Sequence, residues 1–412
     1  MKKASIVSIG NEILSGRTLD SNCSYLSARL LSMGIPVVSA YTSRDDTGAI
    51  VRSLELACAD ADVVVTTGGL GPTDDDLTRN AVAEFLGVEL EMRPGLVDEL
   101  ERFFVRRGRQ MPERNRIQAC IPVGAEAIEN ALGTAPGIKT ERRGKQLFVL
   151  PGVPSEMRRM FEVSVVGQLE RFAGGQCVVV KRLRCFGAGE SAIAEMVGGI
   201  MERGRNPLVN CTVNQEGITL DIVATSEDKD LAAEMAAKDE DVLRETLGDL
   251  VFGTGEESLA EVVGQELVRQ GKTVAVAESC TGGLVAKLLT DVGGASRYFR
   301  CGWVTYDNSA KIAELGVGSE LIKRYGAVSK QVSRAMAAGA RREAGVDLAI
   351  GITGIAGPTG ATEQKPVGLV YISVDFHQGC DTQRCTFPQD RASVRIRAAL
   401  TALNMLRLKL NA

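Results

Sequence analysis

The strongest constraint on the fold is a repeated pattern in which an apolar run ends at a glycine-rich segment and residues with helical spacing follow. The run TVAVA at 273–277 reads as a buried strand, and ESCTGG then leads into a helical pattern from Leu284. In parallel α/β sheets such turns gather at the carboxyl edge, where ligands bind. We therefore expect Ser279 at that edge, with N–H groups of the next helix available for a developing negative charge.

Ser279 is the candidate nucleophile, and it needs a base. The chain holds one histidine, His377, which nearly excludes a Ser-His-Asp triad. The remaining base is a lysine whose ammonium loses its proton through burial and neighbouring positive charge. Cys280 is a rival nucleophile, which we interpret as a small packed residue because no histidine is near it in the sequence.

A second strand-to-helix passage, WVTYDNSAK, supplies the candidate base. Asp307 or Asn308 can cap a helix that carries Lys311 on its first turn. We name Lys311 and Tyr306 as the candidates for proton transfer.

The two strand ends also have a second interpretation. A serine and a lysine at such positions can be a helix cap and a solvated charge. Residues 348–360 again combine an apolar run with a glycine-rich loop. Three such edges favour a phosphate or carbonyl cradle, although a glycine-rich loop is also typical of a simple turn.

From about residue 256 to its end the chain resembles the PncC-type nicotinamide mononucleotide (NMN) amidohydrolase domain of CinA proteins. The matching elements are AESCTGG, TYDNSAK, GAVS at 326–329, GITGIAGPTG, KPVG at 365–368, and Asp390-Arg391 with Arg395. The resemblance implies hydrolysis of the NMN carboxamide to nicotinic acid mononucleotide and ammonia, without a cofactor.

The resemblance also implies a serine nucleophile with a lysine as its proton acceptor, which fit Ser279 and Lys311 with help from Tyr306. We expect backbone N–H groups near Thr281, Gly282 and Gly283 to hold the oxyanion. Arg391 is the candidate for the phosphate, because a guanidinium binds phosphate through two parallel hydrogen bonds. The candidate substrate-binding residues of this domain are Thr281, Gly282, Gly283, Thr353, Gly354 and Arg391.

The first part of the chain repeats the α/β pattern. Residues 4–9 form an expected strand, the segment Asp20-Ser21-Asn22 caps an expected helix through Met33, and the strand at 61–67 opens into GGLGPTDDDLT at 68–78. The N–H groups of such a loop can cradle phosphate, whereas its aspartates repel phosphate unless a divalent cation lies between them. The aspartates have a second interpretation as partners of the helix dipole.

Residues 1–174 resemble the amino-terminal domain of CinA proteins, which is related to molybdopterin-binding proteins of the MoaB and MogA type. The matching segments are GNEILSGRTLDSN, GGLGPTDDDLT, Glu113-Arg114-Asn115 with Gln118-Ala119, and LPGVPSEM. The resemblance implies hydrolysis of ADP-ribose with a divalent metal such as Mg²⁺ or Mn²⁺. The candidate ligand-binding glycines are Gly68, Gly69 and Gly71, and the candidate metal residues are Asp75, Asp76, Glu12 and Asp20.

Between the two domains lies a smaller α/β segment. Residues 177–186 and 217–224 alternate like strands, and residues 191–203 and 230–246 have helical spacing. We expect an α+β connector of about ninety residues, a region that in CinA proteins resembles a KH fold. Its GAGE segment lacks the GXXG loop with basic flanks that binds nucleic acid. We expect the connector to join the domains and to help form a homodimer.

Composition limits the remaining classes of function. The 412-residue chain has a net charge of −4, so no overall attraction to nucleic acid is expected. The sequence MKK leads into a short strand rather than an apolar signal core, and no membrane span is expected. The ten cysteines form no CxxC pair, so a reducing cytoplasm is the expected location.

We therefore predict an α/β fold with two three-layer domains, MoaB/MogA-like and PncC-like, joined by a small α+β KH-like connector, with bounds at 1–174, 175–255 and 256–412. The predicted function is NMN hydrolysis by a Ser-Lys mechanism, with a second, metal-dependent ADP-ribose pyrophosphatase activity, in pyridine nucleotide salvage. Two alternatives stay open. One is a non-enzymatic protein of competence and DNA repair that senses nucleotides, and the other is molybdopterin-cofactor assembly.

Overall fold

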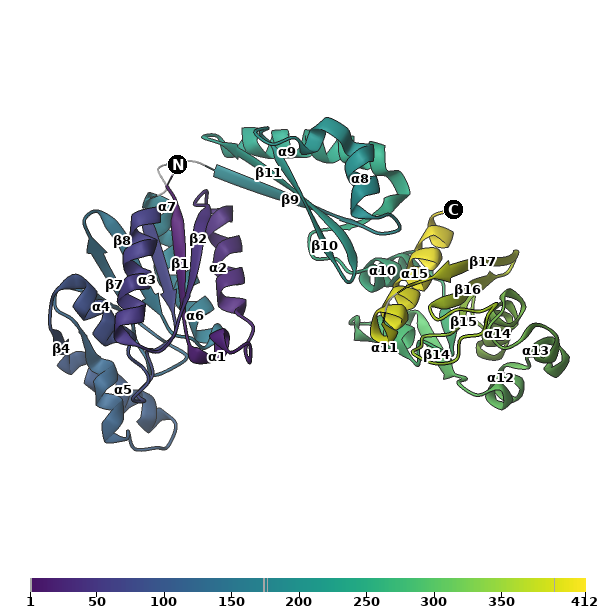
Figure 1. Cartoon of the computed structure of the whole chain (residues 1–412), viewed down its shortest axis with the longest axis horizontal. Coiled ribbons are helices and arrows are strands. Elements are labelled where there is room, and N and C mark those ends of the chain that lie inside the picture. Colours follow the sequence, from purple (N-terminus) through teal and green to yellow (C-terminus); the bar gives the residue numbers. More distant parts are fainter. Residues whose placement is uncertain (1, 173–174, 176, 389) are drawn as a thin grey trace. The chain divides into compact units, whose positions relative to one another are not determined.

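The computed structural model describes residues 2–172, 175, 177–388 and 390–412 (Figure 1). Contacts divide the chain into two compact units, residues 1–179 with 224–234 and residues 180–223 with 235–412. Residue 174, the predicted end of the first domain, lies outside the described residues, and the predicted domain bounds stay predictions. Within the described residues, no helix is long and apolar enough to cross a membrane.

The first domain is built on a sheet whose described strands have the order β2-β1-β3-β8-β7-β6. Neighbours among β2, β1, β3 and β8 are parallel, and β7 and β6 complete the sheet in antiparallel orientation. A small separate sheet pairs β4 with β5. The strands are β1 (Ala4–Ile9), β2 (Val37–Ser43), β3 (Val63–Thr67), β4 (Leu90–Met92), β5 (Cys120–Pro122), β6 (Glu126–Ile128), β7 (Gly137–Arg142) and β8 (Lys145–Leu150).

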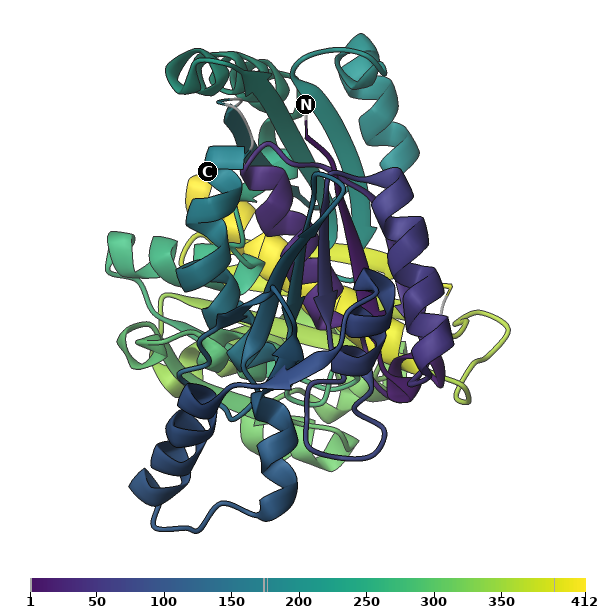
Figure 2. The same ribbon diagram turned by 90° about the vertical axis from the view of Figure 1, so that its left-hand side faces the viewer.

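Helices cover both faces of the six-stranded sheet, which confirms the predicted three-layer architecture (Figures 1 and 2). Leu30 of α2 packs with Ile6 on one face, and Leu54 of α3 packs with Val7 on the other. Within the predicted capping segment 20–22 it is Asp20 that caps α2, because its carboxylate accepts the N–H group three residues later at 2.9 Å. The helices are α1 (Asn11–Leu14), α2 (Ser21–Ser32), α3 (Thr47–Asp60), α4 (Thr78–Leu86), α5 (Pro94–Arg106), α6 (Pro154–Met160) and α7 (Val166–Phe172).

The connector contains a sheet with the order β10-β11-β9-β12. The expected strands and the expected second helix are present, whereas the expected helix at 191–203 is shorter. It ends at Val197 because Gly198 has a positive φ of 53° and a non-helical ψ of −132°, and a short 3₁₀ turn follows. The elements are β9 (Cys177–Cys185), α8 (Glu190–Val197), β10 (Leu208–Asn214), β11 (Gly217–Ser226), α9 (Lys229–Leu247) and β12 (Val251–Thr254).

The last domain has a second α/β sheet, with the order β14-β13-β15-β16-β17. The strands β14, β13 and β15 are parallel, and β16 and β17 are antiparallel to their neighbours. The carboxyl ends of the three parallel strands therefore meet at one edge, as the sequence predicts. The strands are β13 (Val274–Glu278), β14 (Phe299–Val304), β15 (Leu348–Gly354), β16 (Leu369–Phe376) and β17 (Gly379–Thr386).

Helices also cover both faces of this sheet. Leu267 of α10 and Val394 of α15 pack with Val276 on one face, and Met336 of α14 packs with Ala275 on the other. The helices are α10 (Leu259–Gln270), α11 (Leu284–Asp291), α12 (Asn308–Leu315), α13 (Ser319–Tyr325), α14 (Lys330–Ala344) and α15 (Arg391–Asn411). This confirms the second three-layer domain.

The close packing of α14 on β15 depends on Gly351. A Cβ atom on Gly351 would lie 2.3 Å from the Ser333 carbonyl oxygen and 2.5 Å from the Ala337 nitrogen. Both are backbone atoms of α14, so a larger residue would force the helix away from the sheet.

Gly351→Ala should lower the free energy of unfolding by about 1–3 kcal/mol, the usual cost of overpacking. Gly293→Ala is the control, since nothing lies within 4 Å of a Cβ atom at that position. Unfolding in urea measures both variants. A Gly351→Ala protein as stable as the wild type would contradict this account of the packing.

Candidate active site

Ser279 lies at the carboxyl edge of the parallel strands in the last domain. It directly follows β13, which ends at Glu278, and it precedes α11, which begins at Leu284. Its N–H group donates to the carbonyl oxygen of Ile352 in β15 at 3.0 Å, which ties the turn to the sheet. The residue is only 8% exposed. Ser279 thus occupies the usual position of a ligand-binding residue in such sheets.

Lys311 reaches Ser279 from the neighbouring strand-to-helix passage. Asp307 caps α12, because its carboxylate accepts the N–H group of Ser309 at 2.8 Å, and Lys311 follows within the first turns of the helix. Lys311 Nζ lies 3.3 Å from Ser279 Oγ, and Lys311 is only 1% exposed. The two candidate residues are therefore in hydrogen-bond contact in a nearly closed environment.

Backbone carbonyls occupy the other hydrogen-bonding positions of the lysine. Lys311 Nζ donates to the carbonyl oxygens of Thr305 at 2.8 Å and Tyr306 at 3.2 Å. A carbonyl oxygen only accepts, so these partners use two N–H bonds in either protonation state. A neutral amine has no third N–H bond, and its lone pair then faces Ser279 Oγ, the one partner of the three that can donate. This arrangement suits proton transfer from the serine to the lysine.

Burial lowers the pKa of Lys311, whereas the nearby Asp307 carboxylate acts against the shift. Neighbouring positive charge, the second cause that the sequence analysis expected, does not contribute. A lowered pKa raises the neutral fraction at a given pH and so favours lysine as a base.

The rival residues are poorly placed for the same chemistry. Burial raises the pKa of the Cys280 thiol to about 12, which disfavours the thiolate that a cysteine nucleophile needs. His377 follows Phe376, which pairs with Leu348 at the amino end of β15. It therefore lies at the opposite end of the strand from Ser279, and a Ser-His arrangement does not form.

In the turn after Ser279, one of the N–H groups expected to bind the oxyanion is already hydrogen-bonded and two are not. The N–H group of Gly282 donates to the carbonyl oxygen of Ser279 at 3.1 Å, so it is not free for an oxyanion. The N–H groups of Thr281 and Gly283 have no acceptor among the described residues. Gly283 has φ of 90°, a conformation that favours glycine and begins α11. Two of the three expected donors therefore remain available.

Glu278 is a site residue that the sequence analysis missed. Its side chain is fully buried, and its carboxylate accepts the N–H groups of Val285 at 3.2 Å and Ala286 at 2.9 Å. These bonds cap α11 and hold the turn that carries Ser279. A charged residue at the end of an otherwise apolar strand was the available signal.

Two buried hydroxyls beside Ser279 and Lys311 make no hydrogen bond within the described parts of the chain. They are Thr281 Oγ1 and Thr305 Oγ1, in residues that are 0% and 1% exposed. A buried polar group without a partner costs about 1–3 kcal/mol of stability.

Tyr306 contacts Lys311 through its backbone and not through its side chain. Tyr306 is 60% exposed, and its hydroxyl accepts a hydrogen bond from Arg391 Nη2 at 2.9 Å. Arg391 Nη1 donates to the Gly357 carbonyl oxygen at 2.7 Å. Two predicted site residues therefore form an exposed pair, and the described contacts of the phenol do not include the lysine.

Thr353 and Gly354 lie at the carboxyl end of β15, the third of the predicted strand ends, where they contact neighbouring segments. The Thr353 hydroxyl donates to the Ala327 carbonyl oxygen at 2.9 Å. A Cβ atom on Gly354 would lie 3.0 Å from Cys280 Sγ and 2.7 Å from Val370 Cγ2. Both residues therefore pack the end of β15 against its neighbours, and the Thr353 hydroxyl proton is not free to bond a substrate.

In the first domain, the predicted glycines and carboxylates line one cavity of about 430 Å³. Gly68 and Gly69 have φ of 108° and 66°. A Cβ atom would lie 2.1 Å from the Ile9 carbonyl oxygen at the first and 2.2 Å from Thr78 Oγ1 at the second, so only glycine fits. The predicted residues along this cavity are Glu12, Asp20, Gly68, Gly69, Gly71, Asp75 and Asp76.

Asp76 holds the loop in shape. Its Oδ1 accepts the N–H group of Gly71 at 2.8 Å, and its Oδ2 accepts that of Thr73 at 2.9 Å. The buried guanidinium of Arg79 donates to the carbonyl oxygens of Leu70 at 2.6 Å and Gly71 at 2.7 Å. The N–H group of Gly71 is therefore not free to cradle phosphate.

The predicted metal residues do not form a ready metal centre. Asp20 caps α2, Asp76 holds the loop, and Asp75 accepts the Thr73 hydroxyl at 2.5 Å, a bond that lowers the pKa of Asp75. Within the described ranges, no group of three or more His, Cys, Asp or Glu side chains gathers to hold a metal ion. The carboxylates as arranged do not fit a resident metal ion, and the metal requirement stays a prediction.

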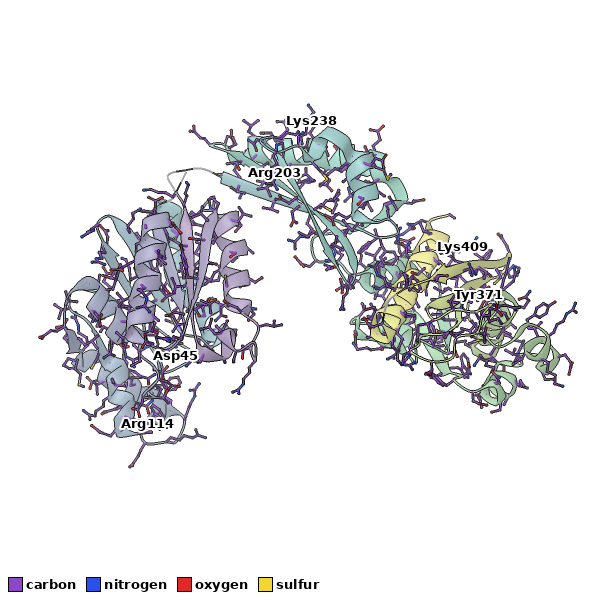
Figure 3. The ribbon with its side chains drawn as sticks, in the orientation of Figure 1. Asp45, Arg114, Arg203, Lys238, Tyr371 and Lys409 are labelled. Atoms are coloured by element: carbon purple, nitrogen blue, oxygen red, sulfur yellow. The ribbon has the colours of Figure 1, made fainter. Side chains whose placement is uncertain are left out.

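Asn22 and Asp45 also line this cavity, although neither is among the site residues predicted from the sequence. Asn22 Nδ2 donates to Thr67 Oγ1 at 2.9 Å and to the Gly152 carbonyl oxygen at 2.8 Å, whereas its buried Oδ1 has no described partner. Asp45, labelled in Figure 3, accepts the N–H group of Asn11 at 2.8 Å. Asn22 lies on the buried side of α2, and a polar residue there was a signal for a site.

Three family models match the chain. The probable molybdopterin binding domain matches residues 5–171, the damage-inducible protein CinA KH domain matches 180–253, and the CinA C-terminal domain matches 256–410.

Full-length relatives carry related names. A putative competence-damage inducible protein of Caldicellulosiruptor saccharolyticus is 40% identical over 404 residues and covers 98% of both chains. A CinA-like protein of Geobacter sulfurreducens is 42% identical over 410 residues and covers 99% of both. The crystal structure of the competence/damage inducible protein CihA from Agrobacterium tumefaciens is 40% identical with a TM-score of 0.36, and covers 37% of this chain and 94% of that one. The chain therefore belongs to the CinA family.

Proposed function

We propose that the last domain hydrolyses the carboxamide of NMN to nicotinic acid mononucleotide and ammonia. The observation that carries this proposal is the 3.3 Å contact between Lys311 Nζ and Ser279 Oγ, with both other lysine positions held by carbonyl oxygens. The substrate comes from the resemblance to the PncC-type domain. An alternative, a nucleotide sensor of competence and DNA repair, would bind NMN without turnover.

In the first half of the proposed reaction, Ser279 Oγ bonds to the carboxamide carbon as Lys311 Nζ takes its proton. The N–H groups of Thr281 and Gly283 are the available donors for the oxyanion. Lys311 then gives its proton to the amide nitrogen, the carbon–nitrogen bond breaks and ammonia leaves. An ester on Ser279 remains.

In the second half, water attacks the ester carbon while Lys311 takes a proton from the water. The proton returns to Ser279 Oγ as the ester bond breaks, which releases nicotinic acid mononucleotide and restores the neutral lysine. Arg391 and Tyr306 are the proposed contacts for the phosphate, because both present hydrogen-bond donors near the surface.

Ser279→Ala should abolish ammonia release from NMN, with a loss of at least about a thousandfold in kcat, because no other nucleophile is activated. Ser296→Ala, at an exposed position, is the matched control. A coupled assay for ammonia and a thermal melt measure activity and folding separately. Wild-type ammonia release by Ser279→Ala would contradict the serine mechanism, and binding of NMN without turnover by the wild type would favour the sensor.

The activity should rise with pH, because only neutral Lys311 accepts the serine proton. Burial lowers the pKa of Lys311, so the rise in kcat/KM should be complete below the ordinary pKa range of lysine. Lys311→Arg should lack activity across the range, since arginine keeps its proton. A flat profile in the wild type, or substantial activity in Lys311→Arg, would contradict lysine as the base.

We propose a second activity for the first domain, the hydrolysis of ADP-ribose to two monophosphates. The supporting observation is the cavity of about 430 Å³ formed by the glycine loop, with the unpartnered Asn22 Oδ1 on its wall. The carboxylates are not gathered into a metal centre, so a metal-dependent reaction would have to recruit its ion with the substrate. A dimer formed through the connector and a cytoplasmic location stay predictions.

ADP-ribose cleavage by the full chain should require Mg²⁺ or Mn²⁺ and should stop in EDTA. Asp75→Asn should lower it, because Asp75 lines the cavity without holding the loop backbone, whereas the exposed Asp98→Asn is the control. Chromatography of the products measures the rate. Full activity in EDTA would contradict the metal requirement, and no cleavage with either ion would contradict the activity itself.

A further inference from the structure

A separate cavity of about 490 Å³ lies beside the start of α14 in the last domain. Its wall includes neither Ser279 nor Lys311. It does include residues from two motifs, GAVS and KPVG, for which the proposed reaction has no use. The residues that matter here are Tyr325, Ser329, Lys330, Lys365, Tyr371 and Arg384.

Three positive side chains share this cavity without a negative partner. Lys330, Lys365 and Arg384 line its wall, and none of them forms an ion pair with a described residue. Lys365 Nζ donates to the carbonyl oxygens of Tyr325 at 2.7 Å and Val328 at 2.8 Å, which hold the charge in place without neutralising it. Like charges gathered in this way repel one another unless an anion joins them.

The start of α14 adds to the positive potential. The helix has 15 residues and begins at Lys330, and the Ser329 hydroxyl caps it by accepting the N–H group of Val332 at 3.3 Å. The N–H groups of the first turn have no partner within the helix, and the helix dipole adds partial positive charge at this end. Lys330 therefore extends from a helix end that itself attracts an anion.

The sheet fixes the opposite wall. Thr353, Tyr371 and Arg384 lie opposite one another on adjacent strands, so they share one face of β15, β16 and β17. Tyr371 is labelled in Figure 3 and brings a hydroxyl to the cavity. Because Thr353 also bonds to Ala327, this face connects the cavity wall with the segment that Lys365 holds.

We propose that this cavity binds a phosphate or pyrophosphate group at a site distinct from the serine site. Two lysines and an arginine supply the charge, and the N–H groups of α14 and the hydroxyls of Tyr325 and Tyr371 supply hydrogen bonds that a phosphate oxygen accepts. The same contacts would recognise a free phosphate or pyrophosphate anion and the phosphate group of a nucleotide.

Lysine acetylation of the full-length protein, followed by mass spectrometry, tests the site directly. Inorganic pyrophosphate should slow acetylation of Lys330 by at least about threefold, as expected once the anion is present at twice its Kd. Lys323, an exposed lysine on α13 paired with Glu320, is the internal control. Potassium chloride at equal ionic strength controls for screening.

Arg384→Ala should remove most of this protection, whereas Arg297→Ala, at an exposed position outside the cavity wall, should keep it. Stronger protection by AMP than by pyrophosphate assigns the phosphate to a nucleotide, and the reverse order assigns it to the free anion. The proposal is overturned if neither compound protects Lys330 more than Lys323, or if the protection is unchanged in Arg384→Ala. The readout needs no turnover, so it is independent of the proposed NMN hydrolysis.

Discussion

The hydrogen bonds around Lys311 Nζ are the interaction on which the site depends. Two carbonyl oxygens take two of its N–H bonds, and burial favours the neutral amine. The lone pair is then left for Ser279. Serine and lysine alone do not make a nucleophile and a base, because an exposed lysine would stay protonated. The proposed chemistry depends on the carbonyl oxygens just after β14 and on the closed surroundings of the side chain.

The sheet brings these groups together. Ser279 follows β13 and Lys311 follows β14, two adjacent parallel strands whose carboxyl ends meet. The same arrangement in the first domain brings the loop after β3 to a cavity at its sheet edge. In both domains glycines are required where the backbone passes close to neighbouring atoms, as at Gly68 and Gly354.

Much of this could be predicted from the sequence, because apolar runs, glycines and helix caps are local signals. The strand before Ser279 and the capping segments that contain Asp20 and Asp307 follow from such signals, whereas the two three-layer domains were implied by the resemblance to CinA proteins. What could not be predicted is how groups are paired in space. The bond from Gly282 to Ser279 and the bonds that Asp76 makes to its loop depend on turn geometry, which residue identity alone does not determine. The early end of α8 at Gly198 depends on a backbone conformation for the same reason.

The most direct test is the pKa of Lys311 in the folded protein, measured by NMR with ¹³Cε-labelled lysine and assigned by the signal lost in Lys311→Arg. The account predicts that Lys311 titrates at lower pH than the exposed lysines, and that it still does so in Ser279→Ala, since burial causes the shift. A Lys311 signal that titrates with the exposed lysines, or above them, would contradict the proposal that a neutral lysine accepts the serine proton.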